Sequence, residues 1–243
     1  MKRISMLKIL TLYIFLCVPA TSADLFINAM QTIKRSLVPV ACFETTDPNS
    51  IKIKLLVGTG FFINDDSFVT AAHVIDTARK ECELTAICLP IGRQWKSGED
   101  VKLNWFRFDR CRANNLLDLA VCQMTETIPN DIRPTPVVFS DTAVPDGTAV
   151  ATTGFPLQIV QPITSRAFVA GYLNLGAPTS EILLDNGSWP GASGSPVYDE
   201  RGYVVGMMVK RSLAAATGIS YARTGKAIQG WLASLDIKTE APK

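Results

Sequence analysis

The sequence has a single histidine, His73, and no pair of cysteines in Cys-x-x-Cys spacing. A structural zinc site needs about four cysteine or histidine ligands, usually in closely spaced pairs, so a zinc cluster is not expected. No motif for another metal or for an organic cofactor is present, and we expect neither. Low-complexity tracts are missing as well, and 47% hydrophobic with 19% charged residues is typical of a globular chain.

Long apolar runs are also missing, except near the N-terminus, and a membrane helix needs roughly 20 apolar residues. The stretch MKRISMLKILTLYIFLCVPATSA places Lys2, Arg3 and Lys8 before a short apolar run and ends in small residues. This order is typical of a secretory signal peptide, with a retained anchor as the alternative. We therefore expect cleavage near Ala23 and an exported protein, periplasmic or secreted, without a stable membrane anchor.

The sequence also lacks a strong net charge. The formal net charge is +2, and loss of residues 1–23 removes three basic residues and no acidic one, which leaves −1. Because no block of Lys and Arg remains, we expect no nucleic-acid partner.

The remaining cysteines number five, and export permits disulfides. An odd count leaves at least one thiol without a partner in the same chain. Short separations in sequence favour the pairs Cys82–Cys88 and Cys111–Cys122. Cys42 is the fifth cysteine and would then have no partner in the chain.

Short strand-like segments separated by Gly, Pro, Asn and Asp make up most of the remaining sequence, a pattern typical of a β-sandwich or β-barrel. Helical spacing of apolar residues is confined to residues 25–37 and 224–235. The polar, proline-bearing segment 126–136 is the predicted linker between two halves, residues 24–125 and 137–243.

His73 follows the hairpin-like segment GTGFFINDDSFVTAA, where a strand is expected to end at a short helical turn. Strand ends present side chains to functional sites, although a lone histidine beside apolar residues is more often structural. Asp118 lies among apolar residues in NNLLDLAVCQM and needs a donor, because a buried unpaired charge costs several kcal/mol, about 2–5. Arg110 or Arg112 could supply that donor, and so could the imidazole of His73.

The segment WPGASGSPV contains the third candidate, Ser193. A serine hydroxyl becomes nucleophilic when a base takes its proton, and the attacked carbonyl needs N–H donors for its oxygen. Gly191 would let the chain turn so that its own N–H and that of Ser193 form an oxyanion hole, although Gly/Ser clusters also occur in ordinary turns. Ser195 is the competing hydroxyl, but it precedes Pro196 and is expected to begin a strand.

The order of these residues discriminates between hydrolase classes. An α/β-hydrolase has its histidine after the serine, whereas His73 precedes every candidate serine. The order His73, Asp118, Ser193 is that of chymotrypsin.

On these segments the sequence resembles the chymotrypsin-like serine proteases, and most closely the exported HtrA-type and related trypsin-like peptidases. GTGFFINDDSFVTAAHVI is similar to the family's histidine segment, LLDLAVCQM to its aspartate strand, and LLDNGSWPGASGSPVYDERGYVVGMMV to its serine segment. The resemblance implies an all-β fold of two packed six-stranded antiparallel β-barrels, with a short N-terminal and a C-terminal helix. It also implies an endopeptidase that acts on protein or peptide substrates through His73, Asp118 and Ser193.

Ala192 departs from the family pattern, since trypsin-type enzymes have Asp there and HtrA-type enzymes commonly have Asn. Trypsin-type zymogens use that Asp to pair with a new N-terminus, so we expect no such activation switch. We also expect no PDZ domain after the C-terminal helix. Two alternatives stay open: a latent or inactive protease-fold binding protein, and an esterase with the same triad.

Specificity is expected to depend on residues around Asn186 to Trp189 and Gly206 to Ser212. Gly187 stands where trypsin-type enzymes carry the aspartate that selects Lys or Arg, and no second histidine is available to select Glu. A small or medium apolar side chain is therefore the expected preference.

Overall fold

The computed structural model describes residues 22–47, 50–91, 95, 102–211 and 218–240. The predicted signal peptide lies outside these residues, except for Ser22 and Ala23, which begin α1 (Ser22–Lys34). No helix among the described residues has the length and apolar character needed to cross a membrane.

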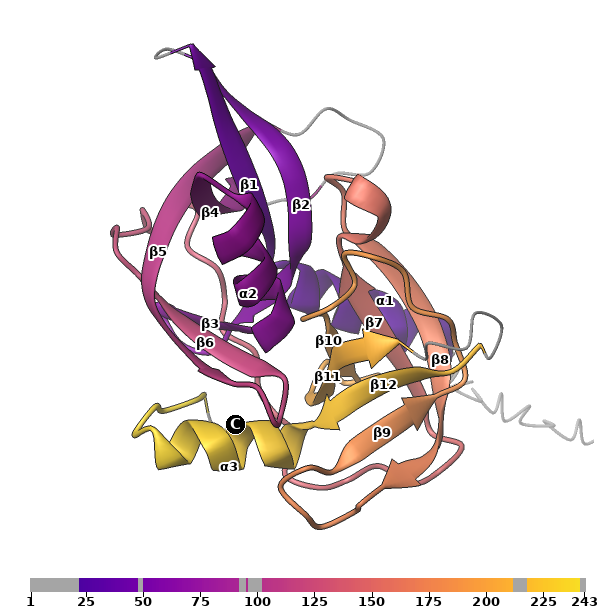
Figure 1. Ribbon diagram of the computed structural model, residues 1–243. Helices are drawn as coiled ribbons and strands as arrows, with labels where there is room; N and C mark the ends of the chain where they lie inside the picture. Colours follow the sequence, from indigo (N-terminus) through magenta and orange to yellow (C-terminus); the bar gives the residue numbers. More distant parts are fainter. Residues whose placement is uncertain (1–21, 48–49, 92–94, 96–101, 212–217, 241–243) are drawn as a thin grey trace, which may run out of the picture.

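The first barrel is closed by six antiparallel strands in the order β1-β2-β3-β6-β5-β4. Helix α2 lies between β3 and β4 in the chain and on the outside of this barrel (Figure 1). The elements are β1 (Leu37–Asp47), β2 (Ser50–Phe62), β3 (Ser67–Thr70), α2 (Ala72–Glu81), β4 (Leu84–Pro90), β5 (Leu103–Asn114) and β6 (Leu119–Met124).

The second barrel repeats this architecture in the order β10-β11-β12-β9-β8-β7. A short 3-10 helix, η1, follows its first strand, and helix α3 follows its last. The elements are β7 (Ala149–Gly154), η1 (Pro156–Gln158), β8 (Ile163–Leu173), β9 (Glu181–Leu184), β10 (Pro196–Tyr198), β11 (Val204–Arg211), β12 (Ser220–Thr224) and α3 (Gly225–Ser234).

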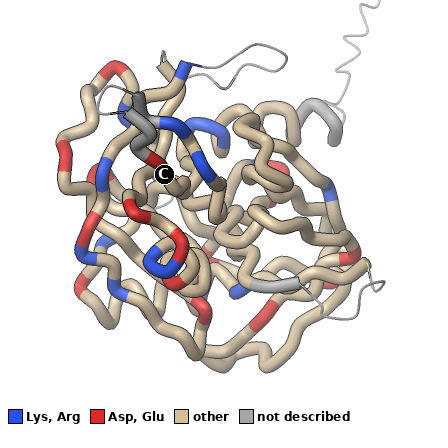
Figure 2. The backbone as a smooth tube through the Cα atoms, turned by 45° about the horizontal axis from the view of Figure 1, so that its top comes forward, with Lys and Arg blue, Asp and Glu red and all other residues tan. Residues whose placement is uncertain are grey.

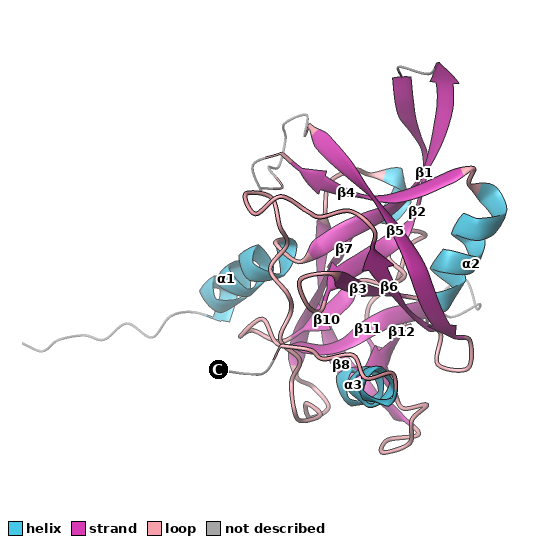
Figure 3. Ribbon diagram, turned by 90° about the vertical axis from the view of Figure 1, so that its left-hand side faces the viewer, coloured by secondary structure: helices cyan, strands magenta, loops and turns pink. Residues whose placement is uncertain are grey.

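The expected fold of two six-stranded antiparallel barrels with an N-terminal and a C-terminal helix is confirmed. Helices α1, α2 and α3 lie outside the strands (Figure 3). The short helical turn expected at His73 is the start of α2, a helix of ten residues.

A shared apolar core joins the first barrel to the segment that leads into the second. Phe68 on β3 meets the ring of Phe108 on β5 edge-on, with centroids 5.0 Å apart. Phe61 on β2 lies 6.3 Å from Phe139, which follows the segment 126–136. That segment contains neither helix nor strand, and it buries Ile128 and Ile132. The polar chain between the barrels is thus packed against the protein rather than extended away from it.

Two disulfides link the first barrel. Cys111–Cys122 bridges β5 and β6, as expected, whereas the expected pair Cys82–Cys88 is wrong. Cys82 follows the last residue of α2 and bonds Cys42 on β1, because α2 packs against β1. Cys88 lies on β4 and is a buried free thiol in the core.

Basic and acidic residues are interspersed along the described backbone rather than grouped by sign (Figure 2). This distribution agrees with the near-zero formal charge of the sequence, and it provides no extended field of one sign.

Thr59 on β2 connects the first barrel to the turn before β10 in the second. Its side-chain Oγ1 donates to the carbonyl of Gly191 at 2.9 Å and accepts from the N–H of Phe155 at 3.0 Å. Its backbone N–H donates to the carbonyl of Ser193 at 2.9 Å, and its own carbonyl accepts from Thr70 Oγ1 at 2.7 Å. Since Thr59 is fully buried, water cannot replace these bonds.

A second contact between the barrels is made by a side chain that bonds a strand residue as a neighbouring strand would. The side-chain amide of Gln158 accepts from the N–H of Leu56 at 2.6 Å and donates to its carbonyl at 2.9 Å. One side chain thus satisfies both backbone groups of a residue on β2. Together, Thr59 and Gln158 fix η1 and the turn before β10 against the same strand.

Burial predicts that the Cys88 thiol is unreactive in the folded protein. Removal from water raises the pKa of Cys88 to about 12, so the reactive thiolate is scarce near neutral pH. The number of thiols that react with Ellman's reagent should be the same for native wild type and native Cys88→Ala. In denaturant, wild type should show one more reactive thiol than Cys88→Ala. Rapid labelling of native Cys88 would contradict this.

Removal of the Thr59 hydroxyl is expected to lower the stability of the protein. Thr59→Val keeps the side-chain shape but leaves the Gly191 carbonyl and the Phe155 N–H without a partner, which should lower the free energy of unfolding by about 1–3 kcal/mol. Thr152→Val is the matched control, because the buried Thr152 hydroxyl has no hydrogen-bond partner. Urea denaturation should separate the two variants, and equal stabilities would refute the role given to Thr59.

Candidate functional site

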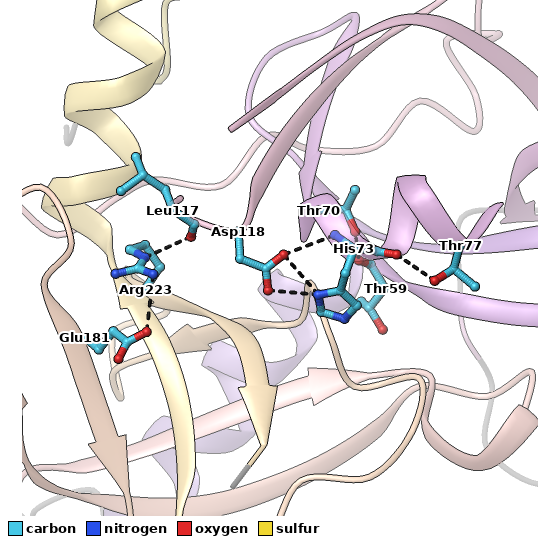
Figure 4. A network of polar contacts seen from close by, with 8 residues as sticks. All are labelled: Thr59, Thr70, His73, Thr77, Leu117, Asp118, Glu181 and Arg223. Carbon is cyan, nitrogen blue, oxygen red and sulfur yellow. Dashed lines mark hydrogen bonds and ion pairs between the residues drawn. The ribbon is translucent and has the colours of Figure 1, made fainter. Parts of the chain in front are cut away.

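His73 is held at the start of α2. Its backbone N–H donates to Asp118 Oδ1 at 3.1 Å, and its ring Nδ1 lies 2.8 Å from Asp118 Oδ2 and 3.0 Å from Oδ1 (Figure 4). Ala71, the residue before the helix, has no side chain that can cap it, so the Asp118 carboxylate satisfies one free N–H of the first turn. With Nδ1–H donated to the carboxylate, Nε2 carries the lone pair and can act as a base.

Asp118 lies in the turn before β6 with a left-handed backbone conformation, φ 54°. Of the donors considered from the sequence, His73 is the partner found, and neither Arg110 nor Arg112 forms an ion pair with Asp118 among the described residues. Arg112 instead donates to the carbonyl of Leu235 at 3.3 Å. The carboxylate is therefore satisfied by both the backbone and the ring of one histidine.

Arg223 on β12 supports Asp118 from the side away from His73 (Figure 4). Its Nε donates to the carbonyl of Leu117 at 3.0 Å, and its Nη2 lies 3.2 Å from Glu181 Oε1. Burial lowers the pKa of Arg223, and the charges of Glu181 and Asp118 oppose that shift. The sequence contains no signal for this cation, which reaches Leu117 from the other barrel, 106 positions along the chain.

Ser193 is brought beside the elements that carry His73. Its carbonyl accepts from Thr59 on β2, and a Cβ added to the neighbouring Gly58 would lie 3.1 Å from that carbonyl oxygen. The same added Cβ would lie 2.5 Å from Cγ2 of Val74, the residue after His73. Ser193 and the first turn of α2 therefore flank one glycine of β2.

The turn from Pro190 to Ser195 has an uneven hydrogen-bond pattern. Its four successive carbonyls, of residues 190 to 193, all accept: from Leu157 at 2.8 Å, from Thr59 Oγ1, from Ser195 at 3.0 Å and from Thr59 N–H. The N–H groups of residues 192, 194 and 195 all donate to backbone carbonyls. Among the described residues, no hydrogen bond is made by the N–H groups of Gly191 and Ser193.

Two glycines make this turn possible. Gly191 and Gly194 have φ of 92° and 86°, a region that other residues rarely adopt. A Cβ at Gly191 would collide with the carbonyl of Phe155, and one at Gly194 with the carbonyl of Thr59. Backbone is therefore packed against backbone on both sides of Ser193. Ser195 is almost fully buried, and its hydroxyl has no hydrogen-bond partner.

The segments expected to shape specificity border a hollow of about 180 Å³ beside this turn. It is lined by Gly187, Ser188 and Trp189 before the turn, by Ala192 in it, and by Met208 on β11. Asn186 is fixed by the Ser220 hydroxyl, which donates to its Oδ1 at 2.8 Å. Ser212 lies outside the described residues. The preference for a small or medium apolar side chain stays a prediction.

Metal ligands are not gathered anywhere in the described part of the chain, where no group of three or more His, Cys, Asp or Glu side chains could hold an ion. The groups that His73, Asp118 and Ser193 offer are an imidazole, a carboxylate and a hydroxyl.

Comparison with solved structures finds the same fold in bacterial proteases. The active form of the Rv3671c protease from M. tuberculosis superposes with a TM-score of 0.63 at 19% identity, over 98% of this chain and 97% of that one. A serine endoprotease from Yersinia pestis gives 0.63 at 15% identity, over 90% and 67%. The HtrA-type protease AlgW, determined with a tripeptide, gives 0.63 at 17% identity, over 86% and 63%. At these identities the likeness shows a shared fold.

Among curated protein sequences, none matches the chain significantly. The family model described as "Trypsin-like peptidase domain" matches residues 58–207. That range covers more than half of the chain and runs from β2 to β11, so it includes His73, Asp118 and Ser193. The protein therefore belongs to the family of trypsin-like peptidase domains.

Proposed function

We propose that the protein is an exported serine endopeptidase that cleaves peptide bonds in protein or peptide substrates through His73, Asp118 and Ser193. The family supports peptidase chemistry. The observation that carries the assignment of roles is the contact of His73 Nδ1 with both carboxylate oxygens of Asp118, at 2.8 and 3.0 Å. A histidine held in this way presents Nε2 as the base that a serine nucleophile requires.

In the proposed reaction, Ser193 Oγ forms a bond to the scissile carbonyl carbon while its proton passes to His73 Nε2. Asp118 stabilises the imidazolium that results. His73 then gives this proton to the leaving amine as the C–N bond breaks, and an acyl-enzyme remains on Ser193. Water attacks the acyl carbon, its proton passes through Nε2 to Ser193 Oγ, and the carboxylic acid product leaves.

The N–H groups of Gly191 and Ser193 are the proposed oxyanion hole. Support comes from the hydrogen-bond pattern of the turn, in which every carbonyl from Pro190 to Ser193 accepts a bond while these two N–H groups remain available. The Pro190 carbonyl points to Leu157, and across a trans peptide bond the N–H of Gly191 points the opposite way. Donors fixed before the substrate arrives are the kind that stabilise a developing oxyanion most strongly.

Export is proposed from the N-terminal sequence and supported by the two disulfides, which form and persist in oxidising compartments. Cleavage near Ala23 would occur at the first residues of α1. The mature protein would be periplasmic or secreted.

The roles of the two serines predict opposite results for their alanine variants. Ser193→Ala should lower kcat for a peptide substrate by about a millionfold, as in other triads, and His73→Ala should do the same. Ser195→Ala is the matched control and should keep its activity, because the Ser195 hydroxyl is buried and unbonded. A fluorophosphonate probe should label wild type and Ser195→Ala but not Ser193→Ala.

Each alternative function has its own outcome in that experiment. No labelling of folded wild-type protein would favour a latent or inactive binding protein over an enzyme. Labelling together with ester cleavage and no amide cleavage would favour an esterase. Loss of activity in Ser195→Ala alone would overturn the assignment of the nucleophile.

The proposed oxyanion hole predicts that two glycine-to-alanine variants differ in kcat. Gly191→Ala forces the turn to move, since its Cβ would meet the Phe155 carbonyl, and kcat should fall by about 10²- to 10³-fold with little change in KM. Gly230→Ala on α3 is the matched control, because a Cβ at Gly230 has open space around it and Gly230 lies outside the turn and the specificity segments. Equal kcat values for the two variants would show that the Gly191 N–H is not used.

A further inference from the structure

A cavity of about 450 Å³ lies at the start of α3, away from the nucleophile turn. Its volume is within the range of pockets that hold small organic ligands. Its walls come from the turn before β6, the segment after Ser140, the loop between β8 and β9, β11 and α3. The apolar part of the wall includes Leu117, Ala143, Tyr172, Pro178, Val205 and Trp231.

Ser180 supplies an unsatisfied polar group in this wall. The residue is 3% exposed, and its hydroxyl has no hydrogen-bond partner. Both backbone polar groups of Ser180 are hydrogen-bonded. Its N–H donates to the carbonyl of Ala177 at 3.0 Å, and its carbonyl accepts from the N–H of Thr224 at 3.2 Å. A buried hydroxyl without a partner is unfavourable, so this group indicates that something else in the cavity bonds to it.

The N-terminus of α3 lines the same cavity as Ser180. The bond from the Thr224 N–H to the Ser180 carbonyl holds Ser180 beside the first turn of this ten-residue helix. Lys226, in the same turn, also lines the cavity and forms no ion pair with a described residue. None of the described residues that line the cavity is acidic. A helix N-terminus, a lysine and an O–H donor together favour an anion.

We propose that this cavity binds a small amphipathic carboxylate of the medium-chain fatty-acid type. The carboxylate accepts from the Ser180 hydroxyl and pairs with Lys226 at the N-terminus of α3. The alkyl chain lies against Trp231 and the other apolar wall residues. Leu175, which is strongly exposed and also lines the cavity, gives the apolar wall an extension to the surface.

The test uses quenching of tryptophan fluorescence by 10-bromodecanoate, with 10-bromodecanol as the uncharged analogue. The expected result is saturable quenching by the carboxylate, at least fivefold weaker binding of the alcohol, and loss of the quenching in Trp231→Phe. Binding is read without turnover, so the outcome does not depend on the triad and can be repeated in Ser193→Ala.

Two variants locate the site. A Cβ added to Gly230, which lines the cavity, meets no atom within 4 Å, so Gly230→Leu should fill the cavity and abolish saturable quenching. Lys226→Gln should weaken binding of the carboxylate roughly fivefold and leave binding of the alcohol unchanged. Lys80→Gln is the matched control on α2 and should bind as wild type.

Three results would overturn the proposal: quenching that does not saturate, equal affinity for the carboxylate and the alcohol, or unchanged binding in a folded Gly230→Leu protein. Circular dichroism establishes folding of the variants. Should Gly230→Leu fail to fold, unchanged affinity of Lys226→Gln for the carboxylate overturns the proposal by itself.

Discussion

The buried hydroxyl and backbone of Thr59 hold the two barrels in the register that the site requires. Through its side chain and its N–H, this one residue of β2 contacts the carbonyls of Gly191 and Ser193, while its hydroxyl also accepts from Phe155. The turn around Ser193 belongs to the second barrel, and the helix that carries His73 belongs to the first. A rigid joint between the barrels keeps the turn around Ser193 in a fixed position relative to the helix that carries His73, as the proposed nucleophile and base require.

The bonds made by Thr59 also explain how the turn is held although it contains Ala192. Trypsin-type enzymes anchor the equivalent turn through an aspartate and a newly formed N-terminus, and an alanine cannot do so. Here Thr59 of the first barrel and Leu157 of the second donate to carbonyls of the turn, and the Met208 carbonyl of the second barrel accepts from the N–H of Gly194. The turn is thus fixed by bonds that form when the barrels fold, and none of these bonds involves a newly formed N-terminus.

Arg223 links the two barrels behind Asp118, as Thr59 links them at the turn around Ser193. A buried guanidinium is costly to remove from water, as the lowered pKa of Arg223 indicates, and it is stabilised by Glu181 together with the carbonyls of Leu117 and Thr179. The turn that carries Asp118 in the first barrel is therefore attached to β12 of the second. Both halves of the site are bonded across the boundary between the barrels, and the proposed ligand cavity shares Leu117 and Ser180 with this network.

The sequence by itself indicated a β-sandwich or β-barrel, two terminal helices and the candidates His73, Asp118 and Ser193, because strand periodicity and turn residues are local in the chain. The arrangement as two six-stranded barrels followed only from the resemblance to the chymotrypsin-like proteases. The sequence also predicted Cys111–Cys122, whose strands are adjacent in sequence, but it missed Cys42–Cys82, which required knowing that α2 packs on β1. Only the tertiary structure decided that His73 rather than Arg110 or Arg112 binds Asp118, and that Thr59, Gln158 and Arg223 join the barrels. The physical reason is that each of these bonds depends on how closed sheets pack, and residues about 100 positions apart leave no periodic pattern in a sequence.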